Sequence, residues 1–434
     1  MLSDNHKGGC YAPWISAVCP WYRSAKRTIC CGPVGTDDPS RLQRTDFVDP
    51  QYGCRFGDTR EPGGWTKIMK LLSADIVNFK SLSHLHLDFQ SPAGATRNLT
   101  CLVGDNGAGK TTVLQAIALV LSLATRRTRF ADAFDWHGFL AERIASMGRT
   151  RVELQVALTD AEVELTSSLF CTWYDSLAPD WRESHRIVEP SNHRIVTLVY
   201  EQNHLSSPQG YQAVNQFLGR YYVKALSRTD PDLRRHYRNL GDVFWFDQHR
   251  NLGSASASRY AGSDAEGGPK ESWKAGVEQL RQYLVGWWGY HTSPVRAGGK
   301  DYIPELQEKF CAVFPDRRFV GLAPKEDSGP FGANDFYFLL EAQGRTYDLA
   351  EMSSGEQAVF PLVYEFVRLD ISNSIVLIDE LELHLHPPEQ QRLLASLPRL
   401  GASCQFVIST HSPYLTDAIP NEHEIRLEGG SRCL

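Results

Sequence analysis

The stretch from Leu102 to Leu114, which reads L-V-G-D-N-G-A-G-K-T-T-V-L, restricts the possible folds of this chain more than any other segment. Its glycines, lysine and threonine match the pattern G-x-x-x-x-G-K-[ST] without a mismatch. An apolar run from Leu99 to Val103 precedes it, and apolar residues at helical spacing follow it from Val113 to Leu123. The segment therefore predicts a strand, a glycine-rich turn and a helix, which is an arrangement that binds phosphate groups.

Glycines in such a turn let the backbone approach an anion closely, and the start of the helix adds a partial positive charge. Lys110 can reach the β- and γ-phosphates of a nucleotide, and the hydroxyl of Thr111 can hold a magnesium ion. The alternative is a chance glycine turn ahead of a core helix, which the flanking strand and helix disfavour. The expected nucleotide contacts are Gly104, Asp105, Asn106, Gly107, Ala108, Gly109, Lys110, Thr111 and Thr112.

Composition sets wide bounds on the rest of the chain. With 434 residues, 42% of them apolar, the protein can form two or three domains or one large α/β domain with insertions. The formal charge of −6 provides no overall basic field, so nucleic acid could bind only at local basic patches. No apolar run is long enough to cross a bilayer and the N-terminus lacks a secretory signal, so we expect a cytoplasmic protein.

Residues 1–68 show no sustained helical or strand periodicity, although they carry five of the ten cysteines. The spacing of these cysteines matches no zinc or disulfide pattern. An amphipathic strand begins directly at Met69. This favours residues 1–68 as a disordered extension or the result of a misassigned start codon. A small cysteine-rich binding module is the alternative.

We divide the remaining chain into three parts. Residues 69–130 and 351–434 are expected to form the N-terminal and C-terminal parts of one phosphate-binding domain, and residues 131–350 a globular insert with helices and strands. No heptad repeat is sustained between 130 and 350, so a long coiled coil is excluded. The expected elements are strands within 70–103, 152–158, 187–199, 242–250, 318–322, 336–341 and 346–349, helices at 211–226, 271–288 and 303–314, and a mobile linker at 251–270.

Two polar positions outside the glycine-rich loop are further candidates. Lys80 lies in a turn between two strands just ahead of the loop, and it either faces the nucleotide or is a solvated turn residue. Gln248 and Arg250 follow a buried strand, whose carboxyl end commonly points into the ligand crevice of an α/β sheet. They are candidates for contacts with a nucleotide or a metal-bound water. The equal alternative is that they are ordinary polar residues at the start of a loop.

The segment Met352-Ser-Ser-Gly-Glu-Gln357 precedes a helix with an apolar face. A Ser-Ser-Gly turn at a helix start can bind an anion through backbone N–H groups and two hydroxyls. Ser353 and Glu356 also have the spacing of a capping box, so ordinary helix capping is the alternative.

Two buried strands end in polar residues that suit hydrolysis. The run Ser374-Ile-Val-Leu-Ile-Asp-Glu380 ends in two carboxylates. Asp379 can order a magnesium ion through water, and Glu380 can accept a proton from an attacking water. The run from Cys404 to His411 ends in a histidine, which we interpret as a γ-phosphate sensor, with a satisfied surface histidine as the alternative.

In order along the chain, the motifs G-D-N-G-A-G-K-T-T, S-S-G-E-Q, I-V-L-I-D-E-L-E-L-H-L-H-P and S-T-H-S-P-Y-L resemble those of ABC-type ATPases related to RecF and the SMC proteins. The resemblance is greatest to compact members described as AAA-family ATPases, which include OLD-like proteins and ATPases of bacterial anti-phage systems. It covers residues 69–427. It implies an α/β P-loop NTPase fold of the ABC-head type, with a mixed sheet and a mainly helical insert or lid.

The resemblance also implies a head-to-tail homodimer that holds two ATP molecules with Mg²⁺. Each ATP would lie between the loop Gly104–Thr111 of one subunit and the serine turn of the other, whose contact residues would be Ser353, Ser354, Gly355, Glu356 and Gln357. The segment Glu382–His386 would contact the second subunit, with packing as an alternative role for its two histidines. Within the family Lys80 would touch the phosphates. The family's glutamine loop has no evident counterpart in this sequence, so Gln248 is a candidate for the metal-bound water and its role stays open.

The family comparison implies absences as well. OLD-like relatives carry a toprim nuclease domain after the T-H-S-P segment and SMC relatives carry long coiled coils; we expect neither here, so a nuclease would be a separate effector. The implied function is a Mg²⁺-dependent ATPase switch that is coupled to DNA binding or to a partner effector, in DNA maintenance or anti-phage defence. The alternatives are an ATP-binding dimerising scaffold with little turnover and the ATP-binding subunit of a transporter.

Overall fold

The computed structural model describes residues 46–48, 55–57, 69–134, 136–252, 273–295, 298–326, 329 and 331–428. Within the segment expected to be an extension, strands β1 (Asp46–Val48) and β2 (Arg55–Gly57) pair in antiparallel orientation. The rest of residues 1–68, and the expected linker from residue 253 onward, lie outside the described residues.

A five-stranded parallel sheet forms the centre of the fold. Its order is β15 (Glu424–Arg426), β5 (Leu99–Val103), β14 (Gln405–Thr410), β13 (Ile375–Ile378) and β9 (Val243–Phe246), and every neighbouring pair is parallel. The apolar runs that form β13 and β14 are buried along their whole length, as expected for strands covered on both faces. Because all five strands run in the same direction, the loops that follow their carboxyl ends meet at one edge of the sheet.

Successive side chains of this sheet face two different cores. In β13, Ile375 and Leu377 pack with helix α1 (Lys110–Ala124), whereas Val376 and Ile378 pack with helices α8 (Ser354–Arg368) and α9 (Pro387–Leu400). The alternation of the strand thus fixes which helix covers which face.

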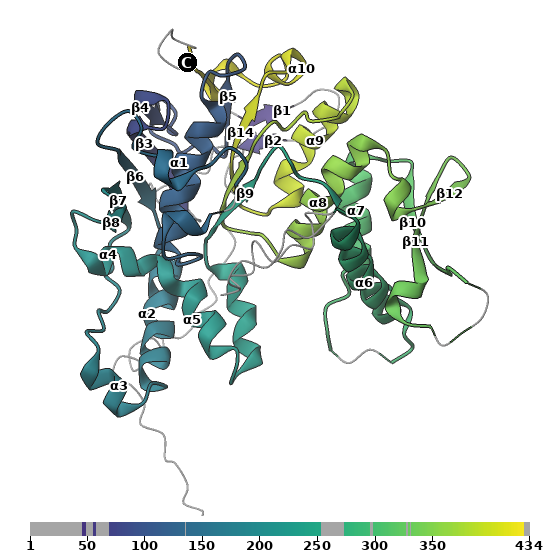
Figure 1. The fold of residues 1–434 in the computed structure, drawn as a ribbon, viewed down its shortest axis with the longest axis horizontal. Helices are drawn as coiled ribbons and strands as arrows, with labels where there is room; N and C mark the ends of the chain where they lie inside the picture. Colours follow the sequence, from purple (N-terminus) through teal and green to yellow (C-terminus); the bar gives the residue numbers. More distant parts are fainter. Residues whose placement is uncertain are drawn as a thin grey trace, which may run out of the picture. The chain divides into compact units, whose positions relative to one another are not determined.

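Helix α1 lies between the parallel sheet and a second, antiparallel sheet (Figure 1). That sheet has the order β4 (Leu82–Asp88), β3 (Lys70–Phe79), β6 (Arg151–Ala157), β7 (Ile195–Glu201) and β8 (His204–Ser206). Helix α1 is apolar around most of its circumference because it is covered on two sides. The three strands expected between residues 70 and 103 are confirmed as β3, β4 and β5.

A helical group follows β6. It contains α2 (Asp160–Asp175), α3 (Pro179–Ser184), α5 (Gly219–Leu226) and the 3₁₀ segment η5 (Pro231–Asn239). The single helix expected at 211–226 is instead broken into α4 (Tyr211–Asn215), a 3₁₀ turn and α5. Helices α2 and α5 approach so closely at Gly219 that a Cβ atom there would lie 2.8 Å from Thr166 Oγ1.

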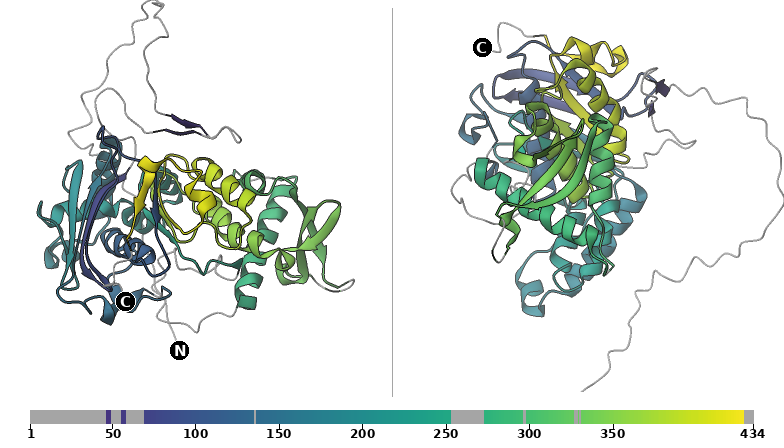
Figure 2. Two further views of the ribbon diagram at one scale, coloured as in Figure 1. Left: turned by 90° about the horizontal axis from the view of Figure 1, so that it is seen from above. Right: turned by 90° about the vertical axis from the view of Figure 1, so that its right-hand side faces the viewer.

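A third sheet of the order β10 (Arg317–Pro324), β11 (Phe336–Ala342) and β12 (Arg345–Asp348) packs on helices α6 (Trp273–Thr292) and α7 (Ile303–Val313) (Figure 2). Residues 131–350 therefore supply strands to all three of these sheets, since β6 to β8 extend the second sheet and β9 ends the first. The mixed α/β fold class expected from the sequence is confirmed. No helix in the described part of the chain is long and apolar enough to span a membrane.

Candidate nucleotide-binding site

The glycine-rich loop follows β5 at the carboxyl edge of the parallel sheet. Gly109 has φ +91°, a left-handed conformation, and a Cβ atom at this position would lie 2.8 Å from Leu82 Cδ2. Asn106 and Gly107 are exposed at the crown of the loop, while Ala108 is buried beneath it. A larger residue at position 109 would therefore be strained by its backbone conformation and would clash with Leu82 on β4.

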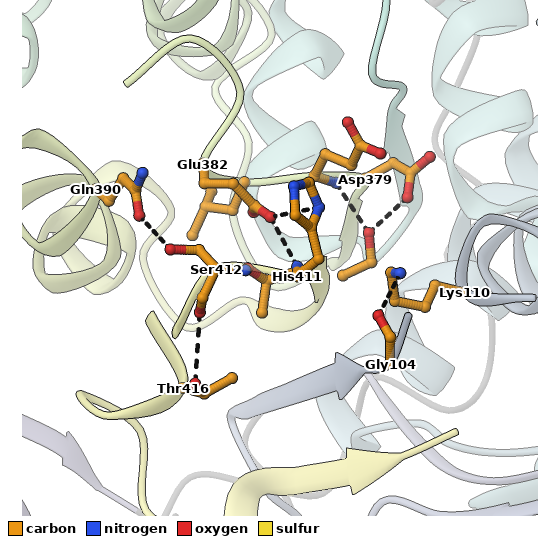
Figure 3. Close-up of polar contacts among 12 residues, drawn as sticks. Gly104, Lys110, Asp379, Glu382, Gln390, His411, Ser412 and Thr416 are labelled. Atoms are coloured by element: carbon orange, nitrogen blue, oxygen red, sulfur yellow. Dashed lines mark hydrogen bonds and ion pairs between the residues drawn. The ribbon is translucent and has the colours of Figure 1, made fainter. Parts of the chain in front are cut away.

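The Lys110 ammonium is directed into this loop. Its Nζ donates hydrogen bonds to the carbonyl oxygen of Gly104 at 2.7 Å (Figure 3) and to that of Asp105 at 2.9 Å. The side chain is buried, so water screens its positive charge only weakly. The loop N–H groups and the start of α1 favour an anion at the same place. These residues fit the phosphates of a nucleotide.

Thr111 on α1 and Asp379 after β13 lie in direct contact. Thr111 Oγ1 donates to Asp379 Oδ2 at 2.8 Å, and Ser409 Oγ donates to Asp379 Oδ1 at 2.5 Å. Burial raises the pKa of Asp379, while the two hydroxyl donors act in the opposite direction. A hydroxyl and a carboxylate together offer the hard oxygen ligands that Mg²⁺ binds, so this pair fits the expected metal.

Glu380 directly follows Asp379 and adopts an unusual backbone conformation. Its φ is +47°, in the left-handed region that non-glycine residues rarely occupy. The Glu380 N–H donates to Ser409 Oγ at 2.8 Å, so one hydroxyl contacts both residues of the acidic pair. Ser409 was not among the candidates from the sequence; a hydroxyl near the end of a buried strand was the available signal.

His411 follows β14 and is held by Glu382. Glu382 Oε1 accepts the backbone N–H of His411 at 2.7 Å and lies 3.1 Å from its Nδ1 (Figure 3). Glu382 is 7% exposed, whereas the His411 side chain is 48% exposed. The imidazole is therefore anchored on its Nδ1 side and open to a ligand on the other.

Ser412 connects this histidine with the segment Glu382–His386. Ser412 Oγ donates to Gln390 Oε1 at 2.6 Å, and Gln390 Nε2 donates to the Leu385 carbonyl at 2.9 Å. The Ser412 carbonyl also accepts a bond from Thr416 in the short helix α10 (Pro413–Thr416), as Figure 3 shows. The side chains of Ser412 and Gln390 therefore connect the loop after β14 with the segment Glu382–His386.

The serine turn caps helix α8. The Ser353 side chain accepts from the Glu356 N–H, and Glu356 Oε2 accepts from the Ser353 N–H at 2.7 Å, so the capping box is present. Ser353 and Ser354 are exposed, whereas a Cβ on Gly355 would lie 3.0 Å from the His384 carbonyl. The two hydroxyl-bearing residues are thus accessible beside the Glu382–His386 segment of the same chain.

Glu356 and Gln357 form hydrogen bonds within their own subunit. The Glu356 carboxylate is buried, forms an ion pair with Arg317 on β10 and accepts the Tyr347 hydroxyl at 2.8 Å. Gln357 Nε2 donates to the Met352 carbonyl at 2.8 Å. The structure places the Glu356 side chain in a link to the third sheet, away from the surface on which Ser354 lies.

Lys80 and Gln248 have local partners. Lys80 Nζ donates to Gln115 Oε1 on α1 at 2.8 Å and to the Gly138 carbonyl at 2.6 Å, and partial burial lowers its pKa. Gln248 Nε2 lies 3.2 Å from His249 Nε2 in the loop after β9. Arg250, considered as a nucleotide or metal-water contact, is instead buried with its N–H groups on main-chain carbonyls.

The carboxyl edge of the parallel sheet thus brings together residues from four loops. The glycine-rich loop follows β5, the acidic pair follows β13, His411 follows β14, and Gln248 follows β9. Among the described residues, no group of three or more His, Cys, Asp or Glu side chains is arranged to hold a metal ion by itself. A metal at Thr111 and Asp379 would therefore need further ligands, such as nucleotide oxygens.

Two family models match the chain. Residues 224–417 match the family described as "AAA domain, putative AbiEii toxin, Type IV TA system", and residues 74–187 match a second family described as "AAA domain". The first range includes the serine turn, the acidic pair and His411. The second includes the phosphate-binding loop.

Among known proteins, an OLD nuclease of Thermus scotoductus is 26% identical over 364 residues, which are 79% of this chain and 59% of that protein. A retron Ec83 probable ATPase of Escherichia coli is 29% identical over 105 residues, 22% of this chain and 19% of that protein. The chain thus spans less than two thirds of these relatives. A solved Smc head bound to a domain of ScpA is 15% identical with a TM-score of 0.44, over 80% of this chain and 92% of that one.

Each family match contains one part of the candidate site. The match over residues 74–187 contains the glycine-rich loop, and the match over residues 224–417 contains the acidic pair that contacts Thr111 at the end of that loop. The two matched segments are therefore similar to AAA-type ATPase domains, and the chain resembles an OLD nuclease and a retron probable ATPase.

Proposed function

We propose that this protein hydrolyses ATP in a Mg²⁺-dependent reaction and acts as a dimerising switch. The hydrogen bond between Thr111 and Asp379 carries the proposal, because it joins the loop that would hold the phosphates to the strand end that bears the acidic pair. Glu380 and His411 follow neighbouring strands at the same edge. Phosphoryl transfer depends mainly on positioning and charge stabilisation, and this edge supplies groups for both.

Each residue has a distinct role in this proposal. Lys110 contacts the β- and γ-phosphates, while Thr111 and Asp379 hold the metal. Bound Mg²⁺ supplies neutralisation of charge on the phosphate oxygens. Glu380 accepts a proton from the attacking water, and His411 contacts the γ-phosphate from its ring edge opposite Glu382. Lys80 and Gln248 are proposed at the periphery, where exchange of their present partners would let them face the nucleotide.

The proposed dimer places the serine turn of one subunit on the ATP of the other. The accessibility of Ser353 and Ser354 supports this arrangement, since a turn buried within its own subunit could not reach a second molecule. The N–H groups at the start of α8, including that of Gly355, and the helix dipole would favour the phosphate charge. Glu356 and Gln357 would support the turn from within.

For the biological role we propose a cytoplasmic switch in anti-phage defence or DNA maintenance that acts on DNA or on an effector nuclease. Similarity to a retron ATPase and to a protein named OLD nuclease supports this direction. Similarity to the Septu protein PtuA of Bacillus mycoides, at 21% identity over 82% of this chain and 40% of that protein, agrees with it.

Phosphate release by the full chain tests the proposal. Wild-type protein should hydrolyse ATP with Mg²⁺ but not with excess chelator, and Glu380→Gln should lower kcat by about 100-fold while ATP still binds. Glu422→Gln, an exposed change away from this edge, is the control. An ATP-binding scaffold would instead show no turnover for Glu380→Gln to remove. Stimulation of turnover by double-stranded DNA would support a switch that acts on DNA. A lack of stimulation would favour a switch that acts on an effector nuclease.

A further inference from the structure

Arg250 lies beneath the acidic pair. It follows β9 in the loop at the carboxyl edge of the sheet and is 6% exposed. One terminal nitrogen donates to the carbonyl oxygens of Asp247 at 3.1 Å and Asp379 at 2.7 Å. The other donates to those of Glu380 at 2.7 Å and Leu381 at 3.4 Å. The guanidinium therefore binds the main chain of three consecutive residues.

Such convergence requires a turn in the chain. In an extended strand, successive residues alternate in direction, so three neighbouring carbonyls cannot all face one group. The left-handed φ of +47° at Glu380 provides the turn, and in a residue with a Cβ atom that conformation is energetically unfavourable. Arg250 stabilises this conformation, because its planar fork bonds carbonyls on both sides of Glu380.

The same guanidinium balances the charge of the site. Burial lowers the pKa of Arg250, and the carboxylates of Asp247, Asp379, Glu380 and Glu382 favour its charged form. The hydrogen bonds of its terminal nitrogens go to carbonyl oxygens and to none of these carboxylates. The carboxylate oxygens thus stay available for Thr111, for His411 and for ligands, while a cation lies close to all of them.

We propose that Arg250 is a positioning residue for ATP hydrolysis, which holds the main chain from Asp379 to Leu381 so that the Glu380 carboxylate faces the attacking water. The inference rests on the proposed function, since it assigns Glu380 the role of general base. Arg250 itself touches neither ATP nor water in this role. Its effect passes through the backbone that it binds.

Arg220 provides a matched control. It is also largely buried and also donates to main-chain carbonyls, those of Leu240 at 3.0 Å and Tyr237 at 2.9 Å. It lies 3.7 Å from Asp242 at the opposite, amino end of β9. Loss of either arginine would remove a buried cation from carbonyl acceptors, but only Arg250 contacts the acidic pair.

The experiment compares Arg250→Ala, Arg250→Lys and Arg220→Ala as full-length proteins, with melting temperature, binding of a fluorescent ATP analogue and ATP turnover measured for each. Both Arg250 variants should lower kcat by about 100-fold with little change in nucleotide binding, because the base is displaced while the phosphate-binding loop is intact. Lysine keeps the charge but cannot span the carbonyls. Low millimolar guanidinium should restore turnover of Arg250→Ala by about tenfold, and should not affect Arg220→Ala.

The outcomes separate the two proposals. If wild-type protein has no ATP turnover, the proposed function fails and this inference fails with it. If wild-type protein is active and Arg250→Lys keeps its kcat, only the inference is overturned. A loss of turnover in Arg250→Lys that parallels its loss of nucleotide binding and melting temperature, as in Arg220→Ala, would also overturn it. Should the alanine variant not fold, the lysine variant alone decides.

Discussion

The hydroxyl of Thr111 donates to the carboxylate of Asp379 at 2.8 Å, although the two residues are 268 positions apart in the chain. The contact forms because β5 and β13 are both neighbours of β14 in one parallel sheet, so their carboxyl ends lie at the same edge. A helix start and a strand end that each suit one part of a nucleotide thus become one site.

This contact predicts how Thr111 affects the metal. Thr111→Ala removes the hydroxyl, and we expect it to raise the Mg²⁺ concentration for half-maximal turnover by about tenfold or more. The metal would lose the hydroxyl as a ligand, and Asp379 would lose the hydrogen bond that orients it. Thr111→Ser keeps the hydroxyl and should stay near wild type. Titration of turnover with Mg²⁺ at saturating ATP measures the effect. Equal Mg²⁺ dependence of the two variants would contradict the role assigned to the hydroxyl.

A second prediction concerns Glu382 and His411. Glu382 Oε1 accepts from His411, and its other oxygen is buried without a hydrogen-bond partner in the described part of the chain. Glu382→Ala should let the imidazole rotate and lower kcat by about tenfold or more, with a smaller change in KM for ATP. Glu422→Ala is the control, since Glu422 also lies beside a histidine, His423, but away from the acidic pair. Unchanged kcat in Glu382→Ala would show that His411 needs no such anchor.

Much of this site could be predicted because its parts are contiguous in sequence. The phosphate-binding loop, the acidic pair and His411 each follow an apolar run that is recognisable as a strand, and the structure places all three at one edge. Parallel strands that are buried on both faces have this continuous apolar pattern, so they can be predicted from the sequence. The order of the strands in the sheet could not be predicted, because it depends on pairings between distant segments.

Residues that act through tertiary contacts were missed or given another role. Gln405 is fully buried, and its amide bonds the N–H and carbonyl of Leu71 on the second sheet, which no local pattern indicates. Arg250 resembled a polar loop residue because its partners are main-chain carbonyls from another strand. Helix α2 was also not predicted. The sequence did contain a signal for its start, because Thr159 caps the helix and Asp160 and Glu162 occupy its first turn.

Glu162 leads to a prediction about pH. Burial raises its pKa from 4.5 to about 7, while its Oε1 accepts the Gly241 N–H at 2.6 Å. The folded state binds this proton more tightly than the unfolded chain, so its contribution favours folding at low pH and is lost as the pH rises from about 4.5 to 7. Above pH 7 the buried charge costs about 3 kcal/mol.

Glu162→Gln keeps an acceptor for Gly241 and removes the charge. It should therefore raise the free energy of unfolding at pH 8 by up to about 3 kcal/mol and have little effect at pH 5. Urea denaturation at both pH values measures the difference. Glu164→Gln is the control, because Glu164 lies exposed on the same helix and should change little at either pH. A Glu162→Gln variant that is equally destabilised at both pH values would contradict the assignment.

The shared ATP site can be tested by mixing two inactive proteins. Lys110→Ala disables the phosphate-binding loop, and Ser354→Arg blocks the exposed serine turn, so each homodimer should lack turnover. In a heterodimer, one site combines the intact Lys110 of one subunit with the intact Ser354 of the other, while the second site carries both changes. An equal mixture should thus recover about a quarter of the wild-type rate, since half of the dimers are mixed and each has one working site. A site contained within one subunit would recover nothing, even where heterodimers are shown by differently tagged chains.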